Sequence, residues 1–336
     1  MRIAFRVDAS PQIGIGHLMR CLTLAEVLKK EGHEIHFISA RLAVDSSWLH
    51  QYKVSILPKE NNQEIHYSDL AQEIDAKKTI DTLCGDIDYL IVDNYDLDIV
   101  WHRILRRYTN KIMVIDDLAD KEFDCDLLLN QNLGSCASDY QGRVPDSCKL
   151  LLGCDYALLR EEFLCLRKRA LEKRESTQQI KNILVCMGGS DKSNATYKVL
   201  QQINNDYNTV VVLGEASIHK QMIKKFSSGR NISVVINANN MSELILNADL
   251  AIGAGGSTSW ERCCLGLPTL VYVLSENQRS VAENLEKIGA VIISRNLSRE
   301  ISSMASDLSM WRSMSMNSQK VCDGTGVKEV KKYLEM

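Results

Sequence analysis

Short runs of apolar residues alternate along this chain with segments in which apolar residues recur every three or four positions. The short runs predict buried strands, and the periodic segments predict amphipathic helices. The predicted strands of the first half are 2–8, 34–39, 53–57, 88–93, 111–116 and 125–130. Those of the second half are 182–187, 209–213, 232–236, 249–253, 269–274 and 290–293. Strands that alternate with helices pair in parallel, so the pattern predicts an α/β fold with two parallel sheets.

A long charged segment without a strand pattern separates the two series of strands. We interpret residues 161–179 as a linker between a first domain, 1–160, and a second domain, 180–296. Residues 297–336 are mostly helical in pattern and are candidates to pack back on the first domain. Two similar α/β halves favour an active site in a cleft between them.

Composition limits the classes of function. The 336 residues are 45% hydrophobic and 25% charged, with a formal net charge of −3, so neither a disordered chain nor a nucleic-acid partner is expected. Eleven cysteines without a C-x-x-C pair indicate reduced thiols and a cytoplasmic protein. No apolar run approaches the ~20 residues that span a bilayer, so no membrane insertion is expected. The sequence leaves the oligomeric state open, with a monomer as the working expectation.

A glycine-rich loop joins the first predicted strand to the first helix and ends in His17. Gly14 and Gly16 allow a ligand close to the backbone, but Met19 stands where a dinucleotide fingerprint has its third glycine. At a helix N-terminus the helix dipole favours a neutral imidazole, which can accept a proton from water. Asp8, on the same loop, is a candidate to orient the ring. The alternative is that His17 only caps the helix.

Two glycine-serine turns in the second half have the character of phosphate-binding loops. Gly188-Gly189-Ser190 and Gly255-Gly256-Ser257 each follow a predicted strand and precede a helix, with Thr258 and Glu261 just beyond the second turn. Backbone N-H groups there can hold a diphosphate, and a carboxylate can accept two hydrogen bonds from a ribose diol. The pair indicates a nucleoside diphosphate, although either turn alone could be a plain connection.

Polar residues follow three further predicted strands. Asn277 and Gln278 carry amides that could bond sugar hydroxyls or N-acyl groups. Asp93-Asn94-Tyr95 and Asp116-Asp117 should lie at the same sheet edge as His17 if the sheet is parallel. The adjacent acids lack a clear third metal ligand, so helix caps and solvated turns are the simpler interpretation, and no metal or cofactor is predicted.

With these motifs the chain resembles the UDP-sugar hydrolases of pseudaminic acid biosynthesis, which are similar to the MurG-type glycosyltransferases. The resemblance extends from the first strand to about Gly289, and its most specific parts are Arg6–Cys21 and Gly253–Pro268. It implies the GT-B fold, with two Rossmann-like domains. It also implies metal-independent hydrolysis of UDP-2,4-diacetamido-2,4,6-trideoxy-β-L-altropyranose at C1, with inversion and release of UDP.

The resemblance also implies roles for individual residues. His17 would be the base on the attacking water, Glu261 would bind the ribose, and the segment 238–241 would meet the uracil, with Asn240 in place of an aspartate. The predicted catalytic residues are His17, Asp8, Tyr95 and Asn277. The predicted substrate-binding residues are Gly14, Gly16, Arg20, Gly188, Gly189, Ser190, Ala238, Met241, Gly255, Gly256, Ser257, Thr258, Glu261 and Gln278.

Three alternatives stay open at this point. The chain could be a GT-B glycosyltransferase that passes the sugar to an acceptor hydroxyl, since only the nucleophile near His17 would differ. It could be a hydrolase of the legionaminic acid pathway, whose stereoisomeric substrate would use the same machinery. It could also be a regulatory module that binds a nucleotide and in which His17 is structural.

Overall fold

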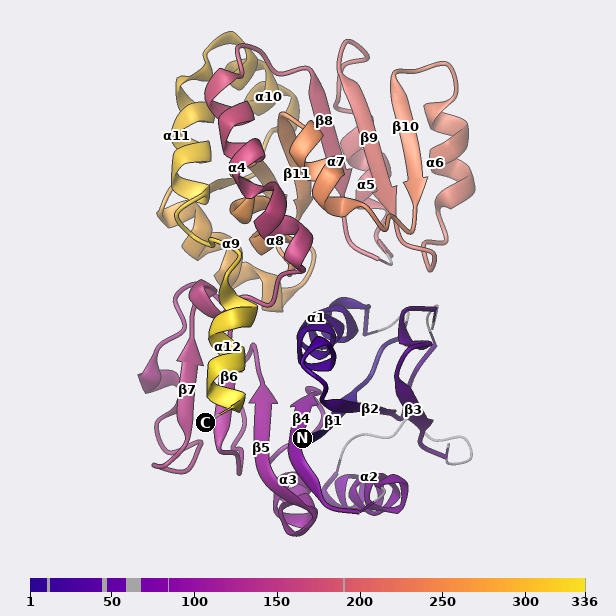
Figure 1. The fold of residues 1–336 in the computed structure, drawn as a ribbon. Helices are drawn as coiled ribbons and strands as arrows, with labels where there is room; N and C mark the ends of the chain where they lie inside the picture. The colour runs from indigo at the N-terminus through magenta and orange to yellow at the C-terminus, as the bar shows by residue number, and fades with distance from the viewer. Residues whose placement is uncertain (11–12, 44–46, 59–67, 84, 190, 336) are drawn as a thin grey trace. The chain divides into compact units, whose positions relative to one another are not determined.

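The chain folds into two compact α/β units, each built on one parallel sheet (Figure 1). The computed structural model describes residues 1–10, 13–43, 47–58, 68–83, 85–189 and 191–335. The first unit comprises Met1–Leu158 with the residues from Gly326 onward, and the second comprises Leu159–Thr325. The prediction of an α/β protein with two parallel sheets is confirmed.

The sheet of the first unit has seven parallel strands, one more than the sequence pattern predicted. Their order is β3 (Lys53–Ile56), β2 (Glu34–Ser39), β1 (Arg2–Val7), β4 (Ile87–Asp93), β5 (Thr109–Ile115), β6 (Leu127–Asn130) and β7 (Lys149–Leu152). The helices of this unit are α1 (Gly16–Lys30), α2 (Asp69–Thr82), α3 (Ile99–Leu105) and α12 (Gly326–Leu334). Side chains alternate across β1, so that Ile3, Phe5 and Val7 enter one hydrophobic core and Ala4 enters the other.

The sheet of the second unit has six parallel strands. Their order is β10 (Ile232–Ile236), β9 (Asn208–Leu213), β8 (Asn182–Cys186), β11 (Leu250–Ala254), β12 (Thr269–Tyr272) and β13 (Val291–Ile293). The helices of this unit are α4 (Glu161–Ser176), α5 (Ala195–Leu200), α6 (Lys220–Ser227), α7 (Met241–Asn247), α8 (Thr258–Cys264), α9 (Arg279–Lys287), α10 (Leu297–Ser306) and α11 (Leu308–Ser318).

In both sheets the strand order reverses at a point that bears on function. In the first unit β1 lies between β2 and β4, and in the second unit β8 lies between β9 and β11. Connections leave the sheet in opposite directions there, which opens a crevice beyond the carboxyl ends of the two central strands. The loop before His17 follows β1, and the two glycine-serine turns follow β8 and β11, so the predicted motifs lie at these crevices.

The segment 161–179, a charged stretch of helical pattern that we interpreted as a linker, contains α4, and α4 lies inside the second unit. Arg174 is only 3% exposed and donates hydrogen bonds to the carbonyl oxygens of Ile245, Ala248 and Leu265. Burial lowers its pKa to about 10, although Asp249 raises it. The charged pattern of this segment therefore did not indicate that Arg174 is buried. Its burial is possible because the guanidinium donates to backbone carbonyl oxygens left unpaired where α7 and α8 end.

The C-terminal segment divides between the units. Helices α10 and α11 belong to the second unit, and only α12 belongs to the first, where it lies against α1 (Figure 1). Val327, Val330 and Leu334 are buried in the same core as Leu18 of α1. The chain enters α12 at Gly326, where a Cβ atom would lie 2.4 Å from the carbonyl oxygen of Ala157, so only glycine fits. None of the described helices combines the length and hydrophobicity needed to cross a bilayer.

We expect the substitution Arg174→Leu to destabilise the second unit by about 2–4 kcal/mol, because it leaves buried carbonyl oxygens without donors. The change would appear in urea-induced unfolding followed by circular dichroism. Arg169→Leu, at an exposed position of the same helix, is the matched control and should change stability by less than about 0.5 kcal/mol. Equal stability of the two variants would contradict the structural role of Arg174.

Candidate active site

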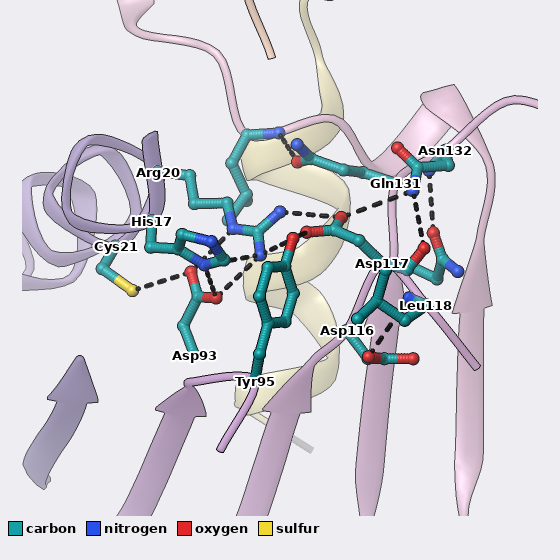
Figure 2. Close-up of polar contacts among 12 residues, drawn as sticks. His17, Arg20, Cys21, Asp93, Tyr95, Asp116, Asp117, Leu118, Gln131 and Asn132 are labelled. Atoms are coloured by element: carbon teal, nitrogen blue, oxygen red, sulfur yellow. Dashed lines mark hydrogen bonds and ion pairs between the residues drawn. The ribbon is translucent and has the colours of Figure 1, made fainter. Parts of the chain in front are cut away.

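His17 lies at the start of α1, above the carboxyl end of β4 (Figure 2). The register of the sheet pairs Val7 with Asp93, so the loop that follows β1 brings His17 over the last residue of β4. The helix has Ile15 at its N-cap and no side-chain capping bond, so the interpretation of His17 as a helix cap is not what the structure shows. The imidazole instead points to Asp93.

The His17–Asp93 pair fixes the proton on one ring nitrogen. Nδ1 of His17 lies 2.5 Å from Oδ1 of Asp93, which is fully buried. Burial alone would raise the pKa of Asp93, but Arg20 and His17 outweigh it and hold that pKa well below its usual range. An ionised carboxylate can only accept hydrogen bonds, so Nδ1 carries the proton and donates it. In the neutral form of this imidazole the lone pair is then on Nε2, which can accept a proton.

Arg20 lies three residues after His17 on α1 and bridges the carboxylates of Asp93 and Asp117 (Figure 2). Its Nε and Nη2 donate to the two oxygens of Asp93 at 2.6 and 2.7 Å, and its Nη1 donates to Oδ1 of Asp117 at 2.9 Å. Burial would raise the pKa of Asp117, but the Arg20 guanidinium lowers it below its ordinary value. We expected Arg20 to bind substrate, whereas most of its donors are taken up by these two carboxylates, so it is a positioning residue.

Tyr95 completes the surroundings of the imidazole. Its hydroxyl donates to Oδ2 of Asp117 at 2.7 Å, and its ring meets the His17 ring edge-on, with 4.5 Å between centroids. Burial, reinforced by Asp117, raises the pKa of Tyr95 far above its usual value, so the phenol stays protonated. Tyr95 therefore holds the plane of the imidazole and is not itself a proton acceptor.

The expectation that Asp8 orients His17 is wrong. Asp8 is buried and accepts hydrogen bonds from Arg6 at 2.7 Å, from the backbone N-H of Ala40 at 2.8 Å and from Asn94 at 2.9 Å. It therefore ties together the segments that follow β1, β2 and β4. Asp93 has the orienting role instead. A signal for it was present in the sequence, since Asp93 is the charged last residue of an otherwise apolar strand.

The acids at this sheet edge are satisfied by protein groups. Arg20 occupies the place between Asp93 and Asp117 where a cation would be needed. Asp116 turns away and accepts from the hydroxyl of Tyr140 and from the backbone N-H of Ala119, each at 2.7 Å. The expectation that these residues share an edge with His17 is confirmed. Asp116 is a turn residue, as we interpreted it from the sequence. Asp117 instead belongs to the hydrogen-bond network of His17, Arg20 and Asp93.

The loop before His17 has one position that requires glycine. Gly14 has a φ of +90°, and its N-H donates to the carbonyl oxygen of Ser10 at 2.7 Å, which closes the turn. A Cβ atom at Gly14 would have no neighbour within 4 Å, so the space around it is open. Gly16 is the first residue of α1. Both glycines lie within three residues of His17 along the chain.

The glycine turns of the second unit meet at the carboxyl edge of its sheet. Gly188 has a φ of +87°, and the backbone of Gly189 packs so closely on Gly214 that a Cβ atom at Gly214 would lie 2.1 Å from the carbonyl oxygen of Gly189. Gly255 and Gly256 follow β11, and Ser257 and Thr258 begin α8. Ser190 lies outside the described residues. The topology thus brings the two turns to neighbouring strands, β8 and β11.

Residues from two further connections of the second unit reach the same edge. A Cβ atom at Gly255 would lie 3.3 Å from the backbone oxygen of Gln278, so Gln278 packs on the second turn. Asn277 lies in the same 3-10 turn, Glu276–Gln278, but its side chain is outside the described part. Ala238 lies in the connection after β10 and Met241 begins α7, and both are half-buried.

Glu261 carries a buried carboxylate oxygen that accepts no hydrogen bond within the described part of the chain. Its side chain is 17% exposed, and its Oε1 lies 3.7 Å from Nη2 of Arg160. Among the described residues nothing is hydrogen-bonded to Oε2. Burial raises the pKa of Glu261, and Arg160 opposes that shift. Buried acceptors are nearly always paired, so this oxygen is a candidate acceptor for a ligand hydroxyl.

Comparisons with known proteins agree with this architecture. Residues 182–334 match the glycosyltransferase family 28 C-terminal domain. The chain is 29% identical over 293 residues to the UDP-2,4-diacetamido-2,4,6-trideoxy-β-L-altropyranose hydrolase of Campylobacter jejuni, covering 86% of this chain and 97% of that protein. It is 28% identical over 299 residues to an uncharacterized protein of Methanocaldococcus jannaschii, of whose length it spans 59%. The resemblance indicated by the motifs is confirmed.

Solved structures show the same fold. MurG of Acinetobacter baumannii has a TM-score of 0.67 at 13% identity, with 99% of each chain covered. The UDP-GlcNAc 2-epimerase of Neisseria meningitidis, bound to UDP-GlcNAc, has a TM-score of 0.64 at 13% identity, with 100% of each chain covered. The fold is thus GT-B-like, with two Rossmann-like units, and the matches together support an enzyme that processes sugar nucleotides.

The lowered pKa of Asp117 gives a prediction about pH. A carboxyl group whose pKa is lower in the folded state stabilises the fold above its unfolded value, about 3.9, and loses that contribution as the pH falls. Asp117→Asn should therefore be less stable than the natural chain at pH 7, and the difference should shrink below about pH 4. Urea unfolding between pH 7 and pH 3 measures it. Asp120→Asn, at an exposed position, is the control, and a difference that grew on acidification would contradict the assignment.

Proposed function

We propose that this protein is a hydrolase that cleaves UDP from UDP-2,4-diacetamido-2,4,6-trideoxy-β-L-altropyranose at C1, with inversion. The observation that carries the proposal is the His17–Asp93 pair, which leaves Nε2 of the imidazole as a proton acceptor beside an open glycine loop. Similarity to the Campylobacter jejuni hydrolase over 86% of the chain supports the choice of reaction and substrate.

His17 acts as the general base in this mechanism. Its Nε2 accepts a proton from water as the water oxygen forms a bond to C1 of the sugar, on the face opposite the UDP group. The ring then becomes an imidazolium, which the ionised Asp93 stabilises through the Nδ1 hydrogen bond. Arg20 keeps the pKa of Asp93 low, so the second proton stays on the ring and Asp93 remains a carboxylate. Asp117 and Tyr95 hold Arg20 and the ring in place.

The second unit binds the leaving group. As the C1–O bond breaks, its electron pair moves to an oxygen of the β-phosphate and UDP leaves. Backbone N-H groups of the turns after β8 and β11 are the donors for that developing charge, and Glu261 accepts from the ribose hydroxyls. The segment around Ala238 and Met241 faces the uracil. UDP is a good leaving group at neutral pH, so the mechanism proposed here involves no metal ion.

A GT-B glycosyltransferase is the second candidate, and the match to the glycosyltransferase family 28 C-terminal domain favours it. An acceptor alcohol would then replace water near His17. Release of UDP from the UDP-sugar in water alone supports hydrolysis, whereas release only after an acceptor is added supports transfer. The stereoisomeric substrate of the legionaminic acid pathway, tested in parallel, decides which diacetamido sugar is preferred.

Replacing His17 tests the proposed base. We expect His17→Ala to lower kcat by about 10²–10⁴-fold while leaving the Kd for UDP unchanged, because the imidazole acts on water and not on the nucleotide. The assay follows UDP and free sugar in the presence of EDTA, with the anomeric product identified by NMR. His50→Ala, at an exposed histidine, is the control. Unchanged turnover in His17→Ala would exclude the assigned role, and no turnover by the natural chain would exclude hydrolysis of this sugar.

Replacing Glu261 tests the ribose contact. Glu261→Gln should raise the Kd for UDP by about tenfold, because an acceptor that takes charged hydrogen bonds is lost. The natural chain should also bind 2′-deoxy-UDP more weakly than UDP, and this preference should shrink in Glu261→Gln. Calorimetric titration measures all four affinities, with Glu283→Gln, at an exposed position, as control. Equal loss of affinity for both nucleotides would show that Glu261 does not contact the 2′-hydroxyl.

A further inference from the structure

A cavity of about 400 Å³ opens at the amino edge of the first sheet, the edge opposite His17. Arg2, Glu34, Lys53 and Ile87, which begin β1, β2, β3 and β4, line it. Its volume lies within the range of small-molecule binding pockets, and all its lining residues belong to the first unit. No step of the proposed hydrolysis uses this cavity.

The lining of this cavity is cationic. Arg2, Lys29 and Lys53 contribute three positive charges, and Glu34 is its one carboxylate. The lining therefore carries two more formal positive than negative charges, whereas the whole chain has a formal charge of −3. Within it, Arg2 pairs with Glu34 at 3.7 Å. Arg2 donates to the carbonyl oxygen of Asp86 at 3.0 Å, and Nζ of Lys29 donates to the carbonyl oxygen of Gln51.

The cavity also has an apolar wall beside the cations. Ile3 and Ile35 lie next to each other in the β1–β2 register, on the same face of the sheet as Tyr52, and are 1% and 8% exposed. Tyr52 contributes an aromatic ring, whose centroid lies 4.9 Å from Nζ of Lys29. A ring of a bound ligand could lie against this wall with a charged group directed at the cations. An inorganic anion alone would leave the apolar wall uncovered.

The side chain of His36 is affected by the positive charges that line this cavity. It is 8% exposed, lines the cavity, and its Nε2 lies 2.9 Å from the hydroxyl of Ser55. Burial, together with the positive charges of Lys53 and Arg2, lowers the pKa of His36 to about 4. The charges that disfavour an imidazolium there would favour an anion in the same space.

We propose that this cavity binds a small phosphorylated metabolite, with its phosphate on Lys29, Lys53 and Arg2 and its organic ring against Tyr52 and the isoleucines. Lysine acts as a point charge toward phosphate, and arginine can offer two parallel donors. The inference is independent of the proposed function. The ligand would lie at the amino edge of the sheet, away from the carboxyl edge that carries His17, so it would be an effector and not the substrate.

Calorimetric titration with ribose 5-phosphate, in the presence of saturating UDP, tests the proposal. The UDP occupies any nucleotide site, so the remaining heat reports a separate site. We expect ribose 5-phosphate to bind more tightly than inorganic phosphate, and ribose without phosphate not to bind. Lys29→Gln combined with Lys53→Gln should raise the Kd for ribose 5-phosphate about tenfold or more, because two charge-assisted contacts are lost.

The matched control is Lys224→Gln combined with Lys225→Gln, which removes two exposed charges from α6 of the second unit. It should leave the Kd for ribose 5-phosphate unchanged. Absence of binding at millimolar ribose 5-phosphate, equal loss in both double variants, or equal affinity for inorganic phosphate would each overturn the proposal. Thermal unfolding verifies that the variants fold, and Lys53→Gln alone, at an exposed residue, replaces the double variant if it does not.

Discussion

The bridge from Arg20 to Asp93 and Asp117 is the interaction on which the geometry of the candidate active site depends. Two carboxylates within reach of one another, one of them fully buried, repel and would take up a proton unless a cation lay between them. Arg20 is that cation, and its planar guanidinium donates to both acids at fixed positions. Asp93 is thereby kept ionised and immobile, and this in turn decides which nitrogen of His17 carries the proton.

A second arginine plays a comparable structural part in the same unit. Arg6 is fully buried on β1 and donates to both Asp8 and Asp75, each at 2.7 Å. Trp101 donates to the same Asp75 at 2.9 Å, and Asn94 donates to Asp8. Buried ion pairs of this kind contribute less to stability than an apolar core of equal volume would, but losing one partner is costly because the other is left charged and buried. The carboxyl edge of the sheet is therefore held in one arrangement by charge.

The chemistry of the site follows from where α1 begins. The glycine loop ends at the first turn of the helix, so His17 and Arg20 lie one turn apart and face the same strand ends. Asp93 and Asp117 follow neighbouring strands, β4 and β5, whose register is set by the apolar residues that precede them. Helix spacing places His17, the proposed base, beside Arg20, and sheet pairing places the two aspartates next to them.

Much of the fold of this protein follows from local patterns in its sequence. Apolar runs predicted the two parallel sheets, and glycines before helices predicted the His17 loop and the turns after β8 and β11, because strand burial and turn geometry are set by adjacent residues. Asp93 in place of Asp8, the burial of Arg174 and the placement of α12 with α1 were decided only by the tertiary structure. Each depends on a partner between about 70 and 300 residues away along the chain, and no local pattern specifies which distant group will satisfy a buried charge or carbonyl.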